Sequence, residues 1–429
     1  MFSNFEKKIC ENIEIIKYNN LYFINNEFIY ISSTKHIELN EVYIKTDIKN
    51  DSKFKPKLLK VLDSGAFIKE NNVEIIEEIT LYVSHDFHHN IVHALFDVLY
   101  PLYLIYINFN ISNENKEFNI FLNLITNQLK PFKGNCSREY SLEVFKKFCK
   151  GNLFLNTKIK KNYCFKNLIC GIGLAGVSSI NKKGIMPGKD LYVLEKFRNR
   201  MMSCYNIEYP KKSNKINIGI IKGGRFNNEE YTILNKIQNK YNNDNTKCMF
   251  IDYYNIQSFE EQLKLISKIN IHISHPGTSM FNFVFLNDNS IHINTGCIYN
   301  GFPSLLESNI CALSNNILVK YYDIHKYKKI LYEPIKNIIN ESINNINNQL
   351  VLKNEIPTFI KIWQELCEKD VKINNLLNKF YFTNRPVGKL PKLSTKFCDG
   401  IVNEYDGFRK KDNNIDNGIL RIIKNKYKQ

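Results

Sequence analysis

The chain has 429 residues, of which 44% are hydrophobic and 24% are charged, and its formal net charge is +17. This composition excludes a disordered chain, and the length predicts more than one domain. Lysine is scattered along the chain rather than massed, so the charge alone does not predict a nucleic-acid partner. A non-catalytic protein that binds a polyanion stays open as an alternative function.

The cysteine spacing and the apolar runs predict the cellular compartment of the protein. The 11 cysteines include no CxxC or CxxH pair, which argues against a zinc module and a disulfide framework and favours reduced thiols. The N-terminus has no apolar h-region, and the most apolar run, 91–111, contains His93, Asp97 and Pro101. We therefore expect no signal peptide, no membrane span and a cytoplasmic protein.

The first half of the chain predicts strands followed by helices. Residues 1–81 alternate polar and apolar side chains in short stretches, which is typical of strands joined by turns. Helical spacing begins near Asn90, and residues 197–207 predict a helix that ends a first lobe.

The clearest pattern lies between residues 216 and 296. Continuous apolar strands alternate four times with segments of helical spacing, and the links between them are short. This alternation predicts a parallel, doubly wound sheet. From about Val319 the chain is expected to be helical again. We therefore divide it into an N-terminal β-rich, Rossmann-like lobe (1–205), a second Rossmann-like lobe (206–330), and a helical extension with a basic tail (331–429).

In such a sheet a ligand binds beyond the carboxyl ends of the strands. The ends predicted for the second lobe are Lys222–Arg225, Asp252–Tyr254, Ser274–Ser279 and Asn294–Gly296.

Histidines spaced by four mark the start of the first helical region. A single helix through His85, His89, His93 and Asp97 would align three imidazoles and a carboxylate on one face. One interpretation is a zinc or iron site, a second is general-base chemistry by His93 and Asp97, and a third is coincidence. For His93 and Asp97 a functional role is favoured, because burying such groups without a purpose is unfavourable.

Two turns of the second lobe carry groups suited to phosphate. Lys222 and Arg225 flank a glycine pair that includes Gly224, and Asn228 is a candidate N-cap of the next helix. Gly277, Thr278 and Ser279 lie between a strand and a helix, where free N–H groups and hydroxyls favour an anion. His275 either contacts a ribose or phosphate or caps the strand. The sequence contains no Asp-x-Asp pair that would hold a divalent ion on a diphosphate.

Taken in order, these segments resemble glycosyltransferase family 61. The residues that carry the resemblance are Asn90, His93, Asp97 and Leu99; Lys222, Arg225 and Asn228; Ser258, Phe259 and Gln262; and Gly277, Asn282 and Phe285. Pro276 stands where the family usually has a histidine, with His275 one residue before it.

The resemblance implies an α/β protein of the GT-B type, with two facing Rossmann-like, doubly wound lobes and a C-terminal helical extension. It implies an inverting, metal-independent transfer of xylose, N-acetylglucosamine or arabinose from a nucleotide-sugar, expected to be UDP-linked, to a glycan or protein. Asp97 or His93 would act as the base, with the other orienting it. The donor-binding residues would be Lys222, Gly224, Arg225, Asn228, Gly277, Thr278, Ser279 and Asn282. Asn90, His89 and His275 would lie on the acceptor side or support the site.

The expected partners are therefore a nucleotide-sugar donor and a glycan or glycoprotein acceptor, with no metal, no cofactor, no nucleic acid and no membrane span. Three alternatives stay open. They are a metal-dependent hydrolase that uses His85, His89 and His93, a non-catalytic polyanion-binding protein, and a non-catalytic member of the family.

Overall fold

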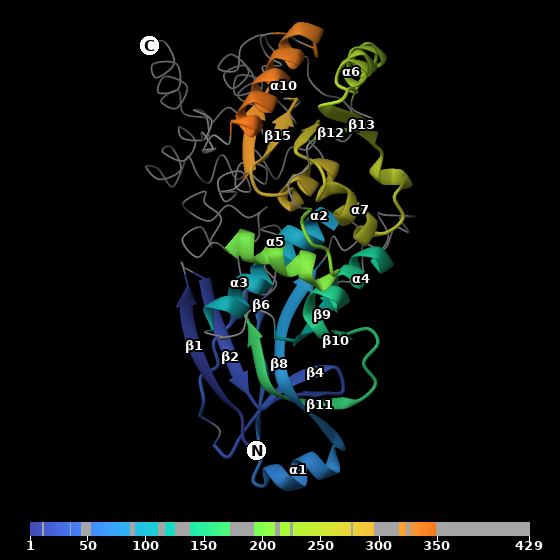
Figure 1. Cartoon of the computed structure of the whole chain (residues 1–429). Coiled ribbons are helices and arrows are strands. Elements are labelled where there is room, and N and C mark those ends of the chain that lie inside the picture. The colour runs from blue at the N-terminus through green and yellow to red at the C-terminus, as the bar shows by residue number, and fades with distance from the viewer. Residues whose placement is uncertain are drawn as a thin grey trace, which may run out of the picture. The chain divides into compact units, whose positions relative to one another are not determined.

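The structure is a computed structural model of the chain (Figure 1). It describes residues 1–10, 13–34, 36–43, 53–85, 91–109, 116–124, 138–171, 193–210, 215–223, 226–275, 278–295, 317–322, 327 and 329–348. The chain forms two compact units. The first unit comprises Met1–Asn181, Ile185–Ile207 and Gln257–Glu260, and the second comprises Lys182–Gly184, Glu208–Ile256 and Glu261–Gln429.

The first unit is built on a sheet that has nine strands among the described residues. Its strands are β1 (Asn4–Cys10), β2 (Ile13–Asn19), β3 (Leu21–Ile24), β4 (Glu27–Ser32), β7 (Lys57–Lys60), β8 (Val73–His85), β9 (Phe118–Leu124), β10 (Lys150–Leu155) and β11 (Asn162–Cys170). β5 (Val42–Tyr43) and β6 (Lys53–Phe54) form a separate pair. The strands predicted for residues 1–81 are thus confirmed, except that α1 (Ser64–Glu70) is a helix, capped by the Asp63 carboxylate.

Four strands of this sheet are parallel to one another and stand in the order β10-β9-β8-β11. β8 is the first of the four in the chain, so the strand order reverses between β8 and β11, as in a Rossmann-like half. The strands from β1 to β4 add antiparallel hairpins, and the sheet is mixed rather than purely doubly wound.

Asparagine turns account for these hairpins. Asn25 and Asn26 form the two-residue loop between β3 and β4, and both have positive φ (50° and 66°). Asparagine tolerates this left-handed conformation better than most residues, and two such residues in succession match the twist of a tight hairpin. The chain therefore returns antiparallel here instead of crossing over through a helix.

The helices of the first unit follow the parallel strands. They are α2 (Ile91–His93), the π-helix η1 (Ala94–Leu99), α3 (Tyr100–Asn108), α4 (Arg138–Cys149) and α5 (Val193–Cys204). The helix predicted over 197–207 is confirmed as α5, although it begins four residues earlier. Aromatic side chains of α3, α4 and α5 pack together: Phe197 contacts Tyr100 (ring centroids 5.7 Å apart) and Phe148 (5.1 Å).

The second unit contains a five-stranded sheet among the described residues, parallel throughout. The helices and strands from β12 onward are, in chain order, β12 (Ile216–Ile221), α6 (Asn228–Lys240), β13 (Thr246–Ile251), η4 (Tyr253–Asn255), α7 (Phe259–Ile266), β14 (Ile271–Ser274), η5 (Thr278–Phe285), β15 (Ser290–Asn294), β16 (Ile317–Tyr321) and α10 (Tyr332–Asn347). The four predicted strands are confirmed. β16 is a fifth strand in the region expected to turn helical, and the segment of helical spacing before β15 is the 3-10 helix η5.

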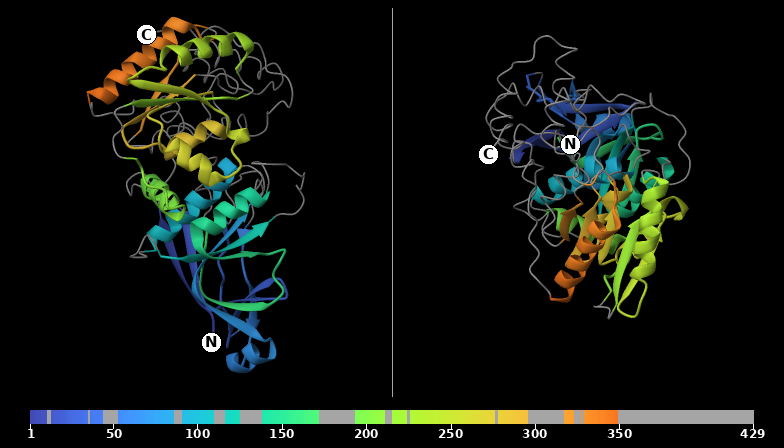
Figure 2. Two further views of the ribbon diagram at one scale, coloured as in Figure 1. Left: turned by 45° about the vertical axis from the view of Figure 1, so that its right-hand side comes forward. Right: turned by 90° about the horizontal axis from the view of Figure 1, so that it is seen from above.

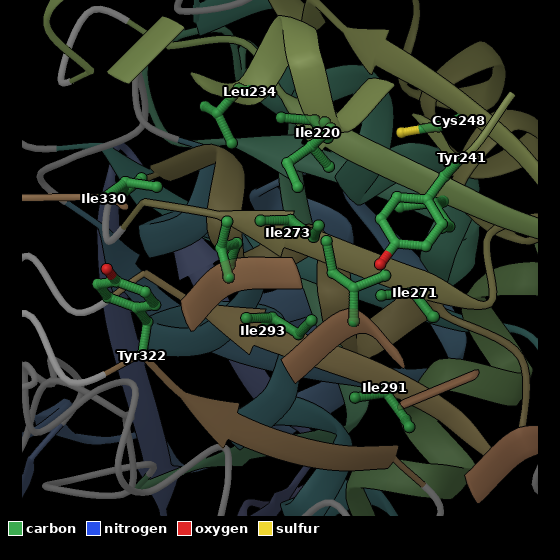
Figure 3. Close-up of a cluster of buried hydrophobic side chains, with 14 of the residues drawn as sticks. Ile220, Leu234, Tyr241, Cys248, Ile271, Ile273, Ile291, Ile293, Tyr322 and Ile330 are labelled. Carbon is green, nitrogen blue, oxygen red and sulfur yellow. The ribbon is translucent and has the colours of Figure 1, made fainter. Parts of the chain in front are cut away.

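Both faces of this sheet are covered. Alternate isoleucines of β12, β14 and β15 point to one face, where they pack against Leu234 of α6 and Ile335 of α10 (Figure 3). Figure 2 shows α6 and α10 side by side on this face and α7 with η5 on the other. The Ile-x-Ile pattern forms strands because branched side chains suit a pleated sheet that is buried on both faces. The protein is therefore α/β, with parallel strands in both units.

Several described cysteines are buried free thiols, namely Cys149, Cys164, Cys170, Cys204 and Cys248. Burial raises the pKa of each, so these thiols are structural rather than nucleophilic. Within the described ranges, every helix is too short or too polar to cross a lipid bilayer.

Candidate functional site

The strand order of the second unit indicates where a ligand binds. The order is β13-β12-β14-β15-β16, so the chain moves outward from β12 to β13 and then returns to the other side of β12 with β14. In chain order this is 2-1-3-4-5, the arrangement in which the ligand crevice opens between the first and third strands at their carboxyl ends. The candidate site therefore lies where β12 and β14 end, next to Lys222 and His275.

The turn after β12 is held by one tyrosine of α6. The Tyr231 hydroxyl accepts a hydrogen bond from the Gly223 amide (3.1 Å) and donates one to the Gly223 carbonyl (2.7 Å). No described atom lies within 4 Å of where a Cβ would stand on Gly223. The backbone of Gly223 is thus fixed, with space beside it for a ligand.

Lys222 and Asp252 face each other across the ends of neighbouring strands. The Lys222 amide donates to the Ile251 carbonyl (2.7 Å), which extends the β12–β13 pairing by one residue. The Lys222 ammonium lies 3.5 Å from Asp252 Oδ2, and the two side chains are 56% and 26% exposed. A surface ion pair of this kind is weak, so Lys222 is free to exchange its partner for a phosphate oxygen.

The N-terminus of α6 differs from the prediction. Asn227, not Asn228, is the N-cap: its side chain accepts from the Glu230 amide (2.9 Å), and the Glu230 carboxylate accepts from the Asn227 amide (3.0 Å). Asn228 is exposed and is the first helical residue. Glu229 and Glu230 occupy the first turn, where their negative charge disfavours the binding of an anion at this helix terminus.

The turn after β14 meets the turn after β12. The His275 ring packs edge-on against the buried Phe226 ring, with centroids 4.7 Å apart. Further along, Thr278 is exposed and Ser279 is half-buried at the start of η5. Asn282 is 9% exposed, and the hydroxyl of Tyr253, at the end of β13, is buried, which raises its pKa.

Two buried histidines form a pair within β14 and β15, two residues before the ends of these strands. His272 and His292 are opposite each other on β14 and β15, and their Nδ1 atoms are 2.9 Å apart. His292 Nδ1 also lies 3.2 Å from the His272 carbonyl oxygen, and the Phe283 ring stacks on the His292 ring (centroids 4.6 Å apart). Because a carbonyl only accepts, His292 carries its proton on Nδ1 and His272 carries its proton on Nε2.

Neither imidazole is suited to hold a charge. Both rings are fully buried, and neither Nε2 atom has a hydrogen-bond partner among the described residues. Burial lowers the pKa of His292 to about 3, and burial together with the neighbouring His292 lowers the pKa of His272 well below its usual value. The pair is therefore neutral at physiological pH.

The candidate residues of the first unit follow β8, at its own reversal of strand order. His93 ends α2 and is partly buried, and Asp97 lies within the π-helix η1, where the Tyr100 amide donates to the Leu95 carbonyl. The neighbours of Asp97, Phe96 and Val98, are fully buried. π-Helical turns occur often at functional sites, so this irregularity favours a functional role for the segment.

The predicted helix through four groups is wrong, because His85 is the last residue of strand β8 and helical structure starts at Ile91. His85 and His93 therefore cannot share one helical face, and the spacing argument for a three-histidine metal site fails. Among the described residues, no group of three or more His, Cys, Asp or Glu side chains is placed to hold a metal ion.

Some predicted site residues lie outside the described part of the chain. They are His89, Asn90, Gly224, Arg225 and Gly277; for His85 and Asp97 the backbone is described but not the side chain. The structure brings together Lys222 and Asn228 on the strand–helix turn after β12, and His275, Thr278 and Ser279 after β14. Asp252 and Tyr254 lie at a predicted strand end, but the sequence assigned them no role. The histidine pair was not predicted, although the repeated Ile-His-Ile of β14 and β15 is a signal for it.

Neither a comparison with protein-family models nor a search of curated proteins finds a match for this chain. The fold and the site define an α/β protein that carries a half-exposed lysine and a glycine turn at the switch point of a parallel sheet.

Proposed function

We propose that the protein is an inverting, metal-independent glycosyltransferase that uses a nucleotide-sugar, as members of family 61 do. The observation that carries the proposal is the position of Lys222. It is a half-exposed cation at the carboxyl end of β12, beside an open glycine turn and at the switch point of a 2-1-3-4-5 sheet. That is where an α/β sheet of this type binds a phosphate-bearing ligand.

The leaving group of such a transfer is a nucleoside diphosphate. Lys222, with Arg225 from the same turn, would stabilise the negative charge that develops on it, and the hydroxyls of Thr278 and Ser279 would donate hydrogen bonds. The sequence has no Asp-x-Asp pair for a divalent ion, so in this proposal cationic side chains supply the charge.

The acceptor is activated from the first unit. The acceptor hydroxyl oxygen bonds to the anomeric carbon as the bond from that carbon to the diphosphate oxygen breaks. The hydroxyl proton passes to Asp97 or His93, one acting as base and the other orienting it. The arrangement of the two units as facing GT-B lobes is part of this proposal.

The resemblance that supports the proposal favours UDP-linked xylose, N-acetylglucosamine or arabinose, with a glycan or protein acceptor. The test is release of UDP from each of these UDP-sugars, with EDTA present and water as acceptor. We expect one donor to turn over and Asp97→Asn to lower its kcat by about 10²- to 10⁴-fold without weakening UDP binding.

Asp63→Asn is the matched control, because it removes a carboxylate that caps α1 ahead of the amino end of β8, and asparagine caps equally well. Near-normal turnover by Asp97→Asn removes Asp97 from the mechanism. Turnover that EDTA abolishes and a divalent ion restores contradicts the metal-independent transfer.

A further inference from the structure

The end of β13 carries two groups that the proposed transfer does not use, Tyr254 and Asp252. The Tyr254 side chain is 84% exposed to solvent, whereas the other described aromatic side chains of this unit are buried or partly buried. Asp252 precedes Tyr254 by two residues and pairs with Lys222 of the neighbouring strand. An aromatic ring, a carboxylate and an ammonium thus follow one another along one edge of the sheet.

These three groups match the three parts of a nucleotide. An exposed aromatic ring offers a stacking surface for a base, a carboxylate accepts hydrogen bonds from ribose hydroxyls, and an ammonium binds phosphate. In doubly wound sheets that bind dinucleotides, an acidic residue after the glycine turn binds the ribose. Asp252 directly follows β13, the strand that comes after the Gly223 turn and α6, so it occupies the corresponding place.

We propose that Tyr254 and Asp252 bind the nucleoside half of a nucleoside diphosphate, and that Lys222 leaves Asp252 for a phosphate oxygen when the ligand arrives. This inference rests on the proposed nucleotide-sugar function and assigns the residues that bind the nucleoside of its donor.

Two hydrogen bonds hold the Asp252 carboxylate in place before a ligand binds. Its Oδ1 accepts from the Tyr254 amide (3.1 Å), and its Oδ2 accepts from the Asn255 side-chain amide (3.0 Å). These two bonds fix the carboxylate while its third partner, Lys222, is held only by a half-exposed ion pair. Departure of Lys222 opens one acceptor position on Oδ2 for a ribose hydroxyl, and the ion pair keeps both groups in place until then.

The test compares a nucleoside diphosphate with pyrophosphate, which has the phosphates but no base or ribose. Equilibrium binding of UDP, GDP, CDP, ADP and pyrophosphate is measured by calorimetry in EDTA. For the nucleotide that binds wild type, Tyr254→Ala should weaken binding at least roughly five-fold, and Tyr254→Phe should not, because the ring is kept. Pyrophosphate binding should be unchanged in both variants, since they leave Lys222 intact.

Asp252→Asn gives a prediction of opposite sign for the two ligands. It should weaken binding of the nucleoside diphosphate, because the ribose contact is lost, and strengthen binding of pyrophosphate, because Lys222 is freed. Asparagine still caps η4, so the fold is retained. Lys222→Ala should weaken the binding of both ligands. Lys247→Ala, which removes an exposed lysine near the amino end of β13, is the charge-matched control.

The outcomes separate the two proposals. If wild type binds a nucleoside diphosphate while Tyr254→Ala and Asp252→Asn bind it as tightly, the nucleoside assignment is overturned and the transferase proposal stands. If Asp252→Asn strengthens both ligands equally, the carboxylate is only a repulsive neighbour and its ribose contact is excluded. If wild type binds none of the four nucleotides, the donor site itself fails, and this inference fails with it.

Discussion

The buried histidine pair should make the second unit sensitive to mild acid. His272 and His292 are neutral in the folded protein, and burial lowers the pKa of both, to about 3 for His292. In the unfolded chain each has an ordinary pKa near 6.5. The unfolded state therefore binds more protons below that pH, so the stabilisation is complete above about pH 6.5 and is lost as the pH falls.

The size of the effect follows from this difference. At about pH 5 an ordinary histidine is mostly protonated, and keeping one neutral in the folded state costs about 2 kcal/mol. For the pair, the free energy of unfolding should fall by about 4 kcal/mol between about pH 7.5 and pH 5. That is a large part of the stability of a typical domain.

The assay is urea unfolding followed by circular dichroism at several pH values, for wild type and for a double variant, His272→Leu with His292→Leu. Replacing both partners with apolar groups removes the titration and leaves no unpaired polar atom, so stability at neutral pH should change little. His36→Leu, which removes an exposed histidine, is the control. A double variant that loses as much stability in acid as wild type would refute the assignment of this sensitivity to the pair.

Three further contacts can be tested by urea unfolding at neutral pH. Asn227→Ala should lower the free energy of unfolding by about 1 kcal/mol and Asn228→Ala by less than about 0.5 kcal/mol, because only Asn227 caps α6; equal losses would contradict that cap. Arg200→Met should cost about 3 kcal/mol, because the buried guanidinium donates to the Phe148 carbonyl (2.9 and 3.1 Å); an unchanged midpoint would argue against those bonds. Tyr231→Phe should cost about 1 kcal/mol by releasing the glycine turn after β12, whereas a neutral result would show that the turn holds without the hydroxyl.

The parallel sheet of the second unit was predictable because its strands are short, continuous and apolar, with β-branched residues at alternate positions. β12 and β15 end at Ile221 and Asn294, next to or at the strand ends predicted from the sequence. β16 was missed because it carries Lys320 within a short apolar run, and its pairing with β15 is a long-range contact that periodicity does not report.

The first unit was less predictable, because local signals compete there. The segment around α1 has apolar residues at mixed spacing, and this pattern alone predicts a strand. The Asp63 side chain accepts hydrogen bonds from two helical amides, and this N-cap stabilises a helix here instead. The mixed sheet depends on which strands pair across long separations, as β11 does with β3 and β8, and no local pattern encodes that choice.

For the candidate site, strand ends were easier to predict than side-chain roles. Lys222 and His275 come at the ends of β12 and β14 as expected, because a strand boundary fixes the position of the residue that follows it. The N-cap was displaced by one residue, since Asn227 and Asn228 are both good caps and Glu230 selects the first. The histidine pair depends on the register of β14 and β15, and the π-helix around Asp97 has no periodic signature.

The most direct test of a nucleotide-sugar transferase is thermal unfolding of the purified protein with UDP, GDP, CMP and their common sugars, with and without EDTA. One nucleotide, expected to be UDP, should raise the Tm by about 5 °C or more at a concentration about 100 times its Kd, equally with EDTA present. No shift with any nucleotide, together with a Tm that EDTA lowers, would contradict the transferase and indicate a bound metal ion instead.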